Sequence, residues 1–306
     1  MKILLTGGAG FIGSHLIEAM LRNGHDIVVI DDLSTGNRAY VPAEVVFYEM
    51  DIRDPKLVEI FEAEKPDVVC HHAAQMSVLI SVREPLLDAS TNILGSVNLL
   101  NAAKHVGVQH FVFASSGGTV YGEPTRLPSA ENDPLLPLSP YGISKLTFEH
   151  YLRISGLRHT ILRYANVYGP RQSPHGEAGV IAIFTERMFK EQETVIYGDG
   201  NQERDFVYVT DVVAANLAAI EQRIAGTFNI GTGIGTSVNR IYELVRHATH
   251  YPYPHRYAEA KKGEVYKIIL DCQRAHEILH WRAQVKLEEG IAETVEFFRQ
   301  QIAWGA

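Results

Sequence analysis

Short apolar runs alternate with segments of helical periodicity along the first half of the chain. Six runs rich in β-branched and aromatic residues predict strands at residues 2–6, 27–31, 45–48, 68–71, 111–114 and 159–163. Between them, residues 12–23 and 92–106 carry apolar side chains at helical spacing. Such alternation is typical of βαβ units, whose right-handed crossovers place helices on both faces of a sheet. The pattern therefore predicts an α/β fold with a doubly wound parallel sheet.

Beyond Arg163 the pattern loosens into Pro- and Gly-rich stretches. Helical periodicity returns at residues 182–190, 211–222, 238–249 and 287–300. We expect a first domain over residues 1–165 and a smaller α/β lobe over residues 166–306, above the carboxyl ends of the strands, where open α/β sheets bind ligands. The helix at 211–222 and a strand at 227–230 are expected to rejoin the first domain, over about 205–230, which makes the division discontinuous.

A glycine-rich turn follows the first predicted strand. The segment TGGAGFIG, residues 6–13, holds the G-x-G-x-x-G spacing and places Gly7, Gly10 and Gly13 around Phe11 and Ile12, which open the next helix. Glycines allow a tight turn and close approach of the backbone to a pyrophosphate, and a helix N-terminus favours an anion. Any tight βα turn also favours glycine. The residues that follow decide between the two interpretations.

The end of the second predicted strand supplies that context. Asp31 stands 18 residues after Gly13, where a carboxylate accepts hydrogen bonds from the adenosine ribose hydroxyls and repels a 2′-phosphate. A Rossmann-type domain that binds NAD rather than NADP is therefore predicted. Asp32 is the weaker candidate because a second acid there is often only solvated. Other candidates lie after the next two strands. Asp51 and Ile52 are expected to contact the adenine, and Ala73 and Ala74 the pyrophosphate and ribose, although a loop or packing role explains each of them equally well.

Composition narrows the function classes. Of the 306 residues 46% are hydrophobic, which suits a globular protein. The 28 Lys and Arg against 36 Asp and Glu give a net charge of −8 without a basic run, so nucleic acid is an unexpected partner. Two cysteines, Cys70 and Cys272, form no disulfide framework, which favours a cytoplasmic location. No apolar run suits a membrane span, and no histidine has metal-ligand spacing, so neither a membrane nor a metal is expected.

A tyrosine and a lysine four residues apart suggest proton-transfer chemistry. In PYGISK, residues 140–145, Tyr141 and Lys145 share one helix face. An ammonium near a phenol stabilises the phenolate and is expected to lower the tyrosine pKa toward the working range. An exposed helical pair is the alternative. Residues 111–122 end an apolar strand in a hydroxyl-rich segment, from which a serine is expected to bond the reacting oxygen beside Tyr141.

Six motifs carry a resemblance over essentially the whole chain: TGGAGFIGSH, Asp31, SSGGTVYGE at 115–123, SPYGISK at 139–145, LRYANVYGPR at 162–171 and GDGNQERDFVYV at 198–209. In them the chain resembles the extended short-chain dehydrogenase/reductase family, and within it the NAD-dependent UDP-hexose 4-epimerases. The resemblance implies NAD bound by the first domain and a UDP-sugar bound by the lobe. It also implies a homodimer through a four-helix bundle formed by residues 92–105 and 141–154 of each subunit.

The resemblance also implies roles for individual residues. Tyr141 is the expected acid/base, and Lys145 tunes it and anchors the nicotinamide ribose. Ser116 is the favoured hydroxyl partner with Thr119 as a second contact, although counting back from Tyr121 without a gap places Gly117 there. Further implied cofactor contacts are Ser34, Gly36, Gln75, Asn92, Ala114, Tyr164 and Val167. Implied substrate contacts are Gly117, Asn166, Val180, Arg204, Lys261 and Glu264.

The role of Arg204 has two interpretations. Its planar guanidinium suits a diphosphate because it can bind two phosphate oxygens at once, but a salt bridge with Asp205 or Asp211 is the alternative.

The residues before Val120 bear on the type of reaction. Related dehydratases carry an Asp-Glu pair, and decarboxylases a Glu, where this chain has Gly118 and Thr119. The resemblance then implies 4-epimerisation by hydride abstraction at C4, rotation of the 4-keto sugar and hydride return. UDP-glucose and UDP-galactose are favoured, with N-acetylhexosamine or glucuronate substrates, a nucleotide-sugar reductase and a non-catalytic NAD sensor as alternatives.

Overall fold

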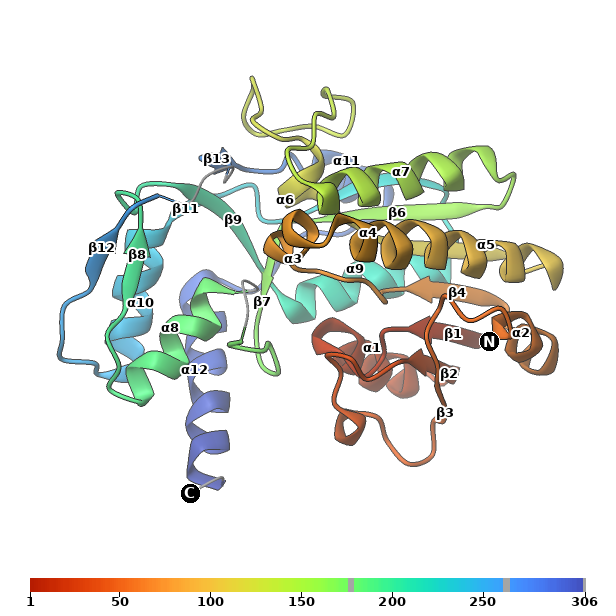
Figure 1. The fold of residues 1–306 in the computed structure, drawn as a ribbon, viewed down its shortest axis with the longest axis horizontal. Coiled ribbons are helices and arrows are strands. Elements are labelled where there is room, and N and C mark those ends of the chain that lie inside the picture. Colours follow the sequence, from red (N-terminus) through yellow and green to blue (C-terminus); the bar gives the residue numbers. More distant parts are fainter. Residues whose placement is uncertain (176–178, 261–264, 305–306) are drawn as a thin grey trace.

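A twisted parallel sheet forms the centre of the protein (Figure 1). The computed structural model describes residues 1–175, 179–260 and 265–304. Within these ranges seven parallel strands pair in the order β10-β6-β5-β4-β1-β2-β3. Their bounds are β1 Lys2–Thr6, β2 Asp26–Asp31, β3 Val46–Glu49, β4 Val68–His71, β5 His110–Ser116, β6 His159–Tyr164 and β10 Gly226–Ile230. The predicted Rossmann-type, doubly wound sheet is confirmed.

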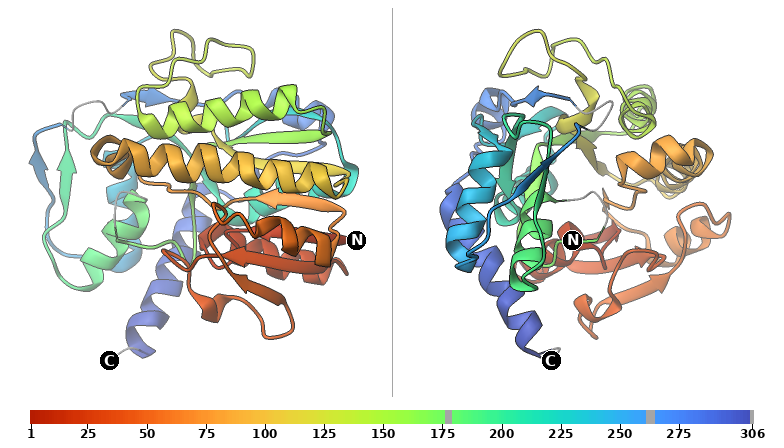
Figure 2. Two further views of the ribbon diagram at one scale, coloured as in Figure 1. Left: turned by 45° about the vertical axis from the view of Figure 1, so that its right-hand side comes forward. Right: turned by 60° about the vertical axis from the view of Figure 1, so that its left-hand side comes forward.

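Helices cover both faces of this sheet (Figure 2). Strand residues alternate between two cores, so Ile3 and Leu5 of β1 belong to one apolar cluster and Leu4 to the other. Helices α1 (Phe11–Arg22) and α9 (Val209–Gln222) contact each other over the first core. Helices α2 (Leu57–Glu64), α5 (Ser96–His105) and α7 (Pro140–Ile154) pack over the second. None of the helices in the described ranges is long and apolar enough to cross a membrane.

The segment before α5 departs from the single helix predicted over residues 92–106. Helices α3 (Val78–Arg83) and α4 (Pro85–Ala89) lead into a π-helical turn, η2 (Ser90–Gly95), and only then does α5 begin. The Ser96 hydroxyl donates to the Asn92 carbonyl at 2.8 Å, while the Asn92 side chain bonds the backbone of Gln75. The wider turn thus lets Asn92 reach the segment after β4, a tertiary contact that helical periodicity does not reveal.

The C-terminal lobe lies beyond the carboxyl ends of the parallel strands (Figure 1). Its larger sheet joins β7 (Asn166–Tyr168), β9 (Glu203–Tyr208), β11 (Gly235–Ser237) and β13 (Lys267–Ile268), while β8 (Val195–Tyr197) pairs with β12 (Arg256–Ala258). Helices α8 (Val180–Phe189), α10 (Val238–Thr249) and α12 (Leu287–Trp304) pack together around an aromatic core. Helix α9 and β10 lie with the first domain's elements, since α9 contacts α1 and β10 pairs with β6, and α11 (Gln273–Ile278) contacts β10.

A fully buried ion pair joins α7 to the sheet. Arg163 on β6 donates from Nη2 to Oε2 of Glu149 on α7 at 2.7 Å, and from Nε to Oε1 at 2.9 Å. The Ser115 hydroxyl on β5 donates to Glu149 Oε1 at 2.6 Å. The Tyr121 hydroxyl accepts from Arg163 at 2.9 Å and donates to Asn229 of β10 at 2.7 Å. Because the groups of both charged partners are bonded, their desolvation is offset, and α7 is tied to β5, β6 and β10.

We expect Glu149→Ala to destabilise the protein by about 3–5 kcal/mol, because it leaves the Arg163 charge buried without its partner. Arg153→Ala is the matched control, since Arg153 contacts the same carboxylate from a partly exposed position and its loss should cost about 1 kcal/mol or less. Urea unfolding followed by circular dichroism measures both. Equal effects of the two variants would contradict a stabilising role specific to the buried pair.

Candidate active site

The glycine-rich turn after β1 has no room for a side chain at Gly7 or Gly13. Gly7 has φ +71°, and a Cβ there would lie 2.7 Å from the Ala73 nitrogen. A Cβ at Gly13 would lie 2.1 Å from the Gly7 carbonyl oxygen. Helix α1 begins after Gly10 without a side-chain cap and without an acidic residue in its first turn. The N–H groups of Phe11, Ile12 and Gly13 therefore keep capacity for an anion, so this turn fits the pyrophosphate of NAD.

Asp31 lies at the carboxyl end of β2 beside this turn. Its Oδ2 accepts from the Ala9 N–H and its Oδ1 from the Leu33 N–H, both at 2.9 Å. A Cβ at Gly36 would lie 2.8 Å from Oδ1, so a glycine is required over the carboxylate. Burial raises the pKa of Asp31, while the two backbone bonds lower it. A carboxylate has about four acceptor positions, so capacity remains for ribose hydroxyls.

The neighbouring acids are arranged differently. Asp32 is exposed, and its Oδ1 accepts from the Ser34 N–H at 3.0 Å and hydroxyl at 2.6 Å. Asp51 is bonded by Arg53, whose side chain lowers the pKa of that carboxyl. Ile52 is buried in the second core, against the π-helical turn before α5, so its side chain serves packing.

The segment after β4 is held at both ends. The Ala73 N–H donates to the Thr6 hydroxyl at 3.1 Å, and Ala74 follows within the same segment. Asn92 accepts from the Gln75 N–H at 2.9 Å and donates to the Gln75 carbonyl at 2.8 Å. These bonds fix the strand end that faces the glycine turn across the β1–β4 crevice, where a doubly wound sheet binds its ligand.

The hydroxyl of Tyr164, at the end of β6, is engaged inside the protein. It bonds the His72 ring at 3.0 Å and donates to the Asn216 amide oxygen of α9 at 3.0 Å. Val167 lies in β7, partly buried beside the first core. Both residues are expected cofactor contacts. The Tyr164 hydroxyl is hydrogen-bonded within the core, and Val167 lies where the chain enters the lobe.

Tyr141 and Lys145 project together from the start of α7. Ser139 caps this helix by accepting from the Gly142 N–H at 3.2 Å, and Pro140 occupies the first turn. The Tyr141 phenol is hydrogen-bonded to Ser116, at the end of β5. The Lys145 ammonium donates to the Ala114 carbonyl at 2.9 Å and lies 5.7 Å from the centre of the Tyr141 ring. The structure thus brings the predicted phenol, ammonium and hydroxyl together.

The pKa values of this pair differ from the sequence expectation. Burial raises the pKa of Tyr141, the negative charge of Asp88 adds to the rise, and the Ser116 hydrogen bond only opposes it. Burial lowers the pKa of Lys145 to about 8, against the opposing effect of Asp88. The lowering of the phenol pKa expected from Lys145 is thus outweighed here, because burial disfavours the charged form of both groups.

Predicted substrate residues lie around the end of β5. Gly117 is buried, and a Cβ there would lie 2.5 Å from Leu270, whereas a Cβ at Gly118 would meet nothing nearer than the Asn166 amide oxygen at 3.6 Å. The Thr119 hydroxyl lies 3.5 Å from the Ser116 carbonyl oxygen. Val180 opens α8 in the lobe. Ser116, Asn166 and the small residues between them therefore share one neighbourhood.

Arg204 projects from β9 of the lobe. Its guanidinium donates to the carbonyls of Glu203 at 3.0 Å and Tyr266 at 3.1 Å. The carboxyl of Asp205 accepts from Thr232, Gly233 and Leu270, and that of Asp211 from the backbone of Gln284 and Val285. Those two acids therefore have other partners. Lys261 and Glu264 lie outside the described residues.

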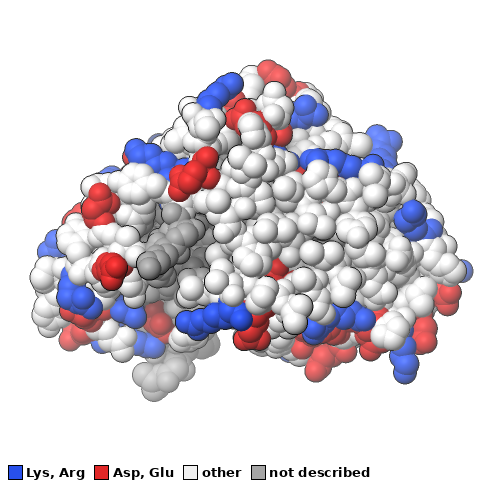
Figure 3. Space-filling model, turned by 45° about the horizontal axis from the view of Figure 1, so that its top comes forward, with Lys and Arg blue, Asp and Glu red and all other residues white. Residues whose placement is uncertain are grey.

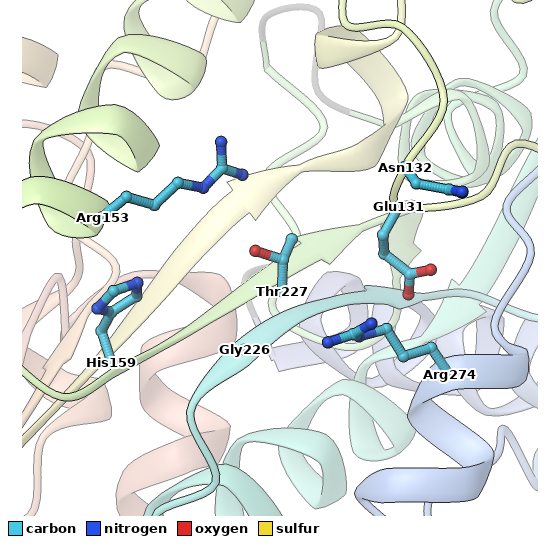
Figure 4. Close-up of a pocket in the computed structure, with 7 residues that line it drawn as sticks. All are labelled: Glu131, Asn132, Arg153, His159, Gly226, Thr227 and Arg274. Atoms are coloured by element: carbon cyan, nitrogen blue, oxygen red, sulfur yellow. The ribbon is translucent and has the colours of Figure 1, made fainter.

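A separate hollow of about 370 Å³ lies away from these groups. Figure 4 shows Arg153 and Arg274 reaching toward Thr227 from opposite sides. His159 and Gly226, which also line it, begin β6 and β10, whereas Ser116 ends β5. The hollow thus lies at the opposite end of the strands from Tyr141 and takes no part in the candidate active site.

Sequence reasoning missed one buried acid close to the pair. Asp88 on α4 is fully buried and influences both Tyr141 and Lys145. It follows Pro85 in a short segment without helical periodicity, so only the tertiary structure reveals it. In the described ranges, no group of three or more His, Cys, Asp or Glu side chains is placed to hold a metal ion.

The sequence pattern of the NAD dependent epimerase/dehydratase family matches residues 3–231. The chain belongs to this family. A putative UDP-glucose 4-epimerase of Methanocaldococcus jannaschii is 46% identical over 301 residues, which span 97% of this chain and 98% of the relative. The resemblance inferred from the sequence motifs is confirmed, and NAD is the cofactor.

Solved structures agree over the whole length. A UDP-glucose 4-epimerase of Thermotoga maritima, solved with UDP-glucose, has a TM-score of 0.95 at 50% identity, covering 99% of this chain and all (100%) of its own. A UDP-glucose 4-epimerase of Thermus thermophilus, solved with NAD, has a TM-score of 0.93 at 43% identity, covering 98% of this chain and 99% of its own. The lobe as well as the sheet is therefore similar to these proteins.

We expect Asp31→Ala to weaken NAD binding at least about tenfold and to narrow the preference for NAD over NADP, because the ribose hydroxyls lose a charged acceptor. Asp32→Ala is the control, since Asp32 bonds only Ser34 among the contacts described above and should change the ratio little. Fluorescence titration with each dinucleotide gives both affinities. An unchanged NAD to NADP ratio in Asp31→Ala would mean that Asp31 only packs at the strand end.

Proposed function

We propose that this protein is an NAD-dependent 4-epimerase that interconverts UDP-glucose and UDP-galactose. The observation that carries the proposal is the contact of the Tyr141 phenol with Ser116, beside the Lys145 ammonium and at the carboxyl edge of the NAD-binding sheet. Similarity to UDP-glucose 4-epimerases over nearly the full chain supports the choice of sugar. UDP-N-acetylhexosamine and UDP-glucuronate are the alternative substrates.

The chain's own groups perform the proton transfers. Bound in the crevice beside the glycine turn, oxidised NAD would supply the acceptor and donor for the hydride at C4 of the sugar, and a positive charge beside the phenol. The Tyr141 oxygen takes the proton of the 4-hydroxyl and gives it back, and the Ser116 hydroxyl orients the same oxygen. Lys145, with a pKa of about 8, is an ammonium below that pH, so its stabilisation of the phenolate is lost as pH rises through 8.

We assign the two binding tasks to different parts of the chain. Residues 1–165, together with α9 and β10, form the proposed NAD-binding domain, because the glycine turn, Asp31 and the segment after β4 all lie there. The remaining residues form the proposed substrate lobe, in which Arg204 would hold the diphosphate. Gly118 and Thr119 bear no acid, which favours epimerisation over dehydration or decarboxylation, since both need a proton donor or acceptor at that point.

Tyr141→Phe should lower epimerase turnover at least about a hundredfold, because it removes the phenol and keeps the ring. NAD should stay bound. Tyr151→Phe is the matched control, since Tyr151 lies on the same helix but is exposed, and its turnover should equal that of the parent. Conversion of UDP-galactose to UDP-glucose, followed by chromatography, measures all three proteins. Near-normal turnover by Tyr141→Phe would overturn the mechanism.

We further propose that the protein forms a homodimer through α5 and α7. Exposed apolar side chains line this region, with Ile154 81% exposed, Leu94 65% and Ile143 50%. Figure 3 shows a broad face with few charged side chains over these helices. An exposed apolar surface of this kind favours association, and a two-fold axis would bring the helix pairs of two subunits into a four-helix bundle.

Ile154→Glu should therefore shift the mass in light scattering from about twice 34.1 kDa toward the monomer value, because a carboxylate would be buried in the interface. Ile278→Glu is the control, since Ile278 is an exposed apolar residue on α11, and this variant should stay dimeric. A parent protein that is monomeric at micromolar concentration would contradict the proposal.

A reducing compartment, the cytoplasm, is the proposed location. Cys70 and Cys272 are free thiols, and Cys70 is buried. Burial raises the pKa of the Cys70 thiol, which makes it a poor partner for disulfide exchange.

A further inference from the structure

A fully buried carboxylate lies next to the proton-transfer pair. Asp88 on α4 accepts at Oδ1 from the side-chain amides of Asn92 at 2.8 Å and Gln75 at 3.0 Å, and at Oδ2 from the Ser144 hydroxyl at 2.6 Å. These three donors are neutral. They satisfy the oxygens as hydrogen-bond acceptors but leave the negative charge itself uncompensated, and a buried charge is costly without an opposite one nearby.

The three donors come from different parts of the active site. Ser144 is buried on α7 and immediately precedes Lys145, three residues after Tyr141. Gln75 and Asn92 hold the segment after β4, beside the crevice for NAD. Because α4 packs against α7 (Figure 1), a single carboxylate connects the cofactor segment to the helix that carries the catalytic residues.

Lys145 carries the positive charge that acts on the Asp88 carboxylate. Lys145 is buried, its ammonium donates to the Ala114 carbonyl of β5, and it lies 4.9 Å from the centre of the Phe113 ring. From β4 it faces His71 and His72, and burial lowers the pKa of both, that of His72 to about 3, so both are neutral.

The helices packed around Lys145 contribute the remaining titratable groups. On α7 itself these are Tyr141 and, one turn further, Glu149, which is paired with Arg163. From α4 comes Asp88, whose charge acts on Lys145. Asp88 and Lys145 are thus opposite buried charges. No hydrogen bond described above joins them, and they act on each other electrostatically.

We propose that Asp88 is a positioning residue that aligns Tyr141 and Lys145 through Ser144 and supplies the negative charge against which Lys145 stays protonated. The proposal rests on the proposed function. It assigns α4 a role in the reaction without contact between Asp88 and the sugar.

The sign of the effect follows from the charge. A nearby negative charge favours the ammonium form of Lys145 and disfavours the phenolate form of Tyr141. Removing the charge of Asp88 therefore lowers the pKa of both groups. If ionisation of Tyr141 gives the acid limb of the pH profile and loss of the Lys145 proton gives the alkaline limb, both limbs move to lower pH. Loss of packing alone would lower turnover at every pH without moving them.

Asp88→Asn tests the charge while keeping the shape. The asparagine Oδ1 can still accept from Asn92 and Gln75, and its amide can donate to a rotated Ser144 hydroxyl, so the hydrogen bonds are kept and only the charge is lost. Ser144→Ala is the matched control, because it removes one bond to Asp88 and keeps the charge. Thermal unfolding of both variants checks that they fold.

Two readouts follow the variants. In ¹³C-lysine NMR, with Lys145 assigned by its absence in Lys145→Met, the Lys145 titration should fall from about 8 in the parent by roughly half a unit or more in Asp88→Asn, and stay in place in Ser144→Ala. The pH profile of kcat should move to lower pH by a similar amount in Asp88→Asn only. Ser144→Ala should lower kcat without a shift.

The outcomes separate the inference from the function on which it rests. An unchanged Lys145 titration in folded Asp88→Asn overturns the role of the charge, and an equal shift in Ser144→Ala assigns the effect to packing and overturns it too. If Tyr141→Phe keeps its turnover, the proposed function fails, whereas the NMR result still decides whether Asp88 holds Lys145 protonated.

Discussion

The buried ion pair between Arg163 and Glu149 is the constraint on which the active-site geometry depends. Helix α7 carries Tyr141 and Lys145 at its start and Glu149 one turn later, so the pair fixes that helix on β6. The same carboxylate accepts from Ser115, the neighbour of Ser116. The Glu149 carboxylate thus holds both α7, which carries Tyr141, and the end of β5, which carries Ser116. Moving either element would separate two buried charges, which is costly.

The two buried carboxylates next to α7 act in opposite ways because their partners differ. Glu149 is paired with a guanidinium, and the charge is compensated where it lies. Asp88 meets neutral donors, so its field extends to Lys145 and Tyr141. Burial favours the neutral forms of both Tyr141 and Lys145. The negative charge of Asp88 restores the ammonium, and the positive charge of oxidised NAD, when bound, favours the phenolate. The protonation states of Tyr141 and Lys145 therefore depend on burial and on the surrounding charges, and not on these two residues alone.

The parts of the site that could be predicted from sequence are those that depend on local backbone. The glycines at 7, 10 and 13 follow β1 and the aspartate at 31 ends β2. The ends of the predicted strands differ from the observed ones by at most two residues, because their apolar runs are continuous. Tyr141 and Lys145 share a helix face at a fixed spacing. The π-helical turn at Ser90–Gly95 and the lobe strands, some of three residues or fewer, were missed because tertiary bonds rather than periodicity form them. Asp88 and Glu149 were missed for the same reason, since each is held in part by a residue distant in the sequence, Ser144 for Asp88 and Ser115 for Glu149.

Epimerisation as proposed requires the 4-keto sugar to rotate between two hydride transfers. This limits which side chains can contact the sugar ring. A firm grip on the ring would hold one face toward the nicotinamide, so the binding energy has to come from the nucleotide and its diphosphate. The chain is suited to this division. Gly118 leaves the space beside Ser116 without a side chain, because a Cβ there would have only ordinary contact with Asn166. Arg204, the charged group proposed for the diphosphate, lies in the lobe on β9, and the proton-transfer groups lie on the sheet side. Under this proposal, separating tight binding from the reacting ring would let one Tyr141 oxygen serve the 4-hydroxyl in both of its orientations.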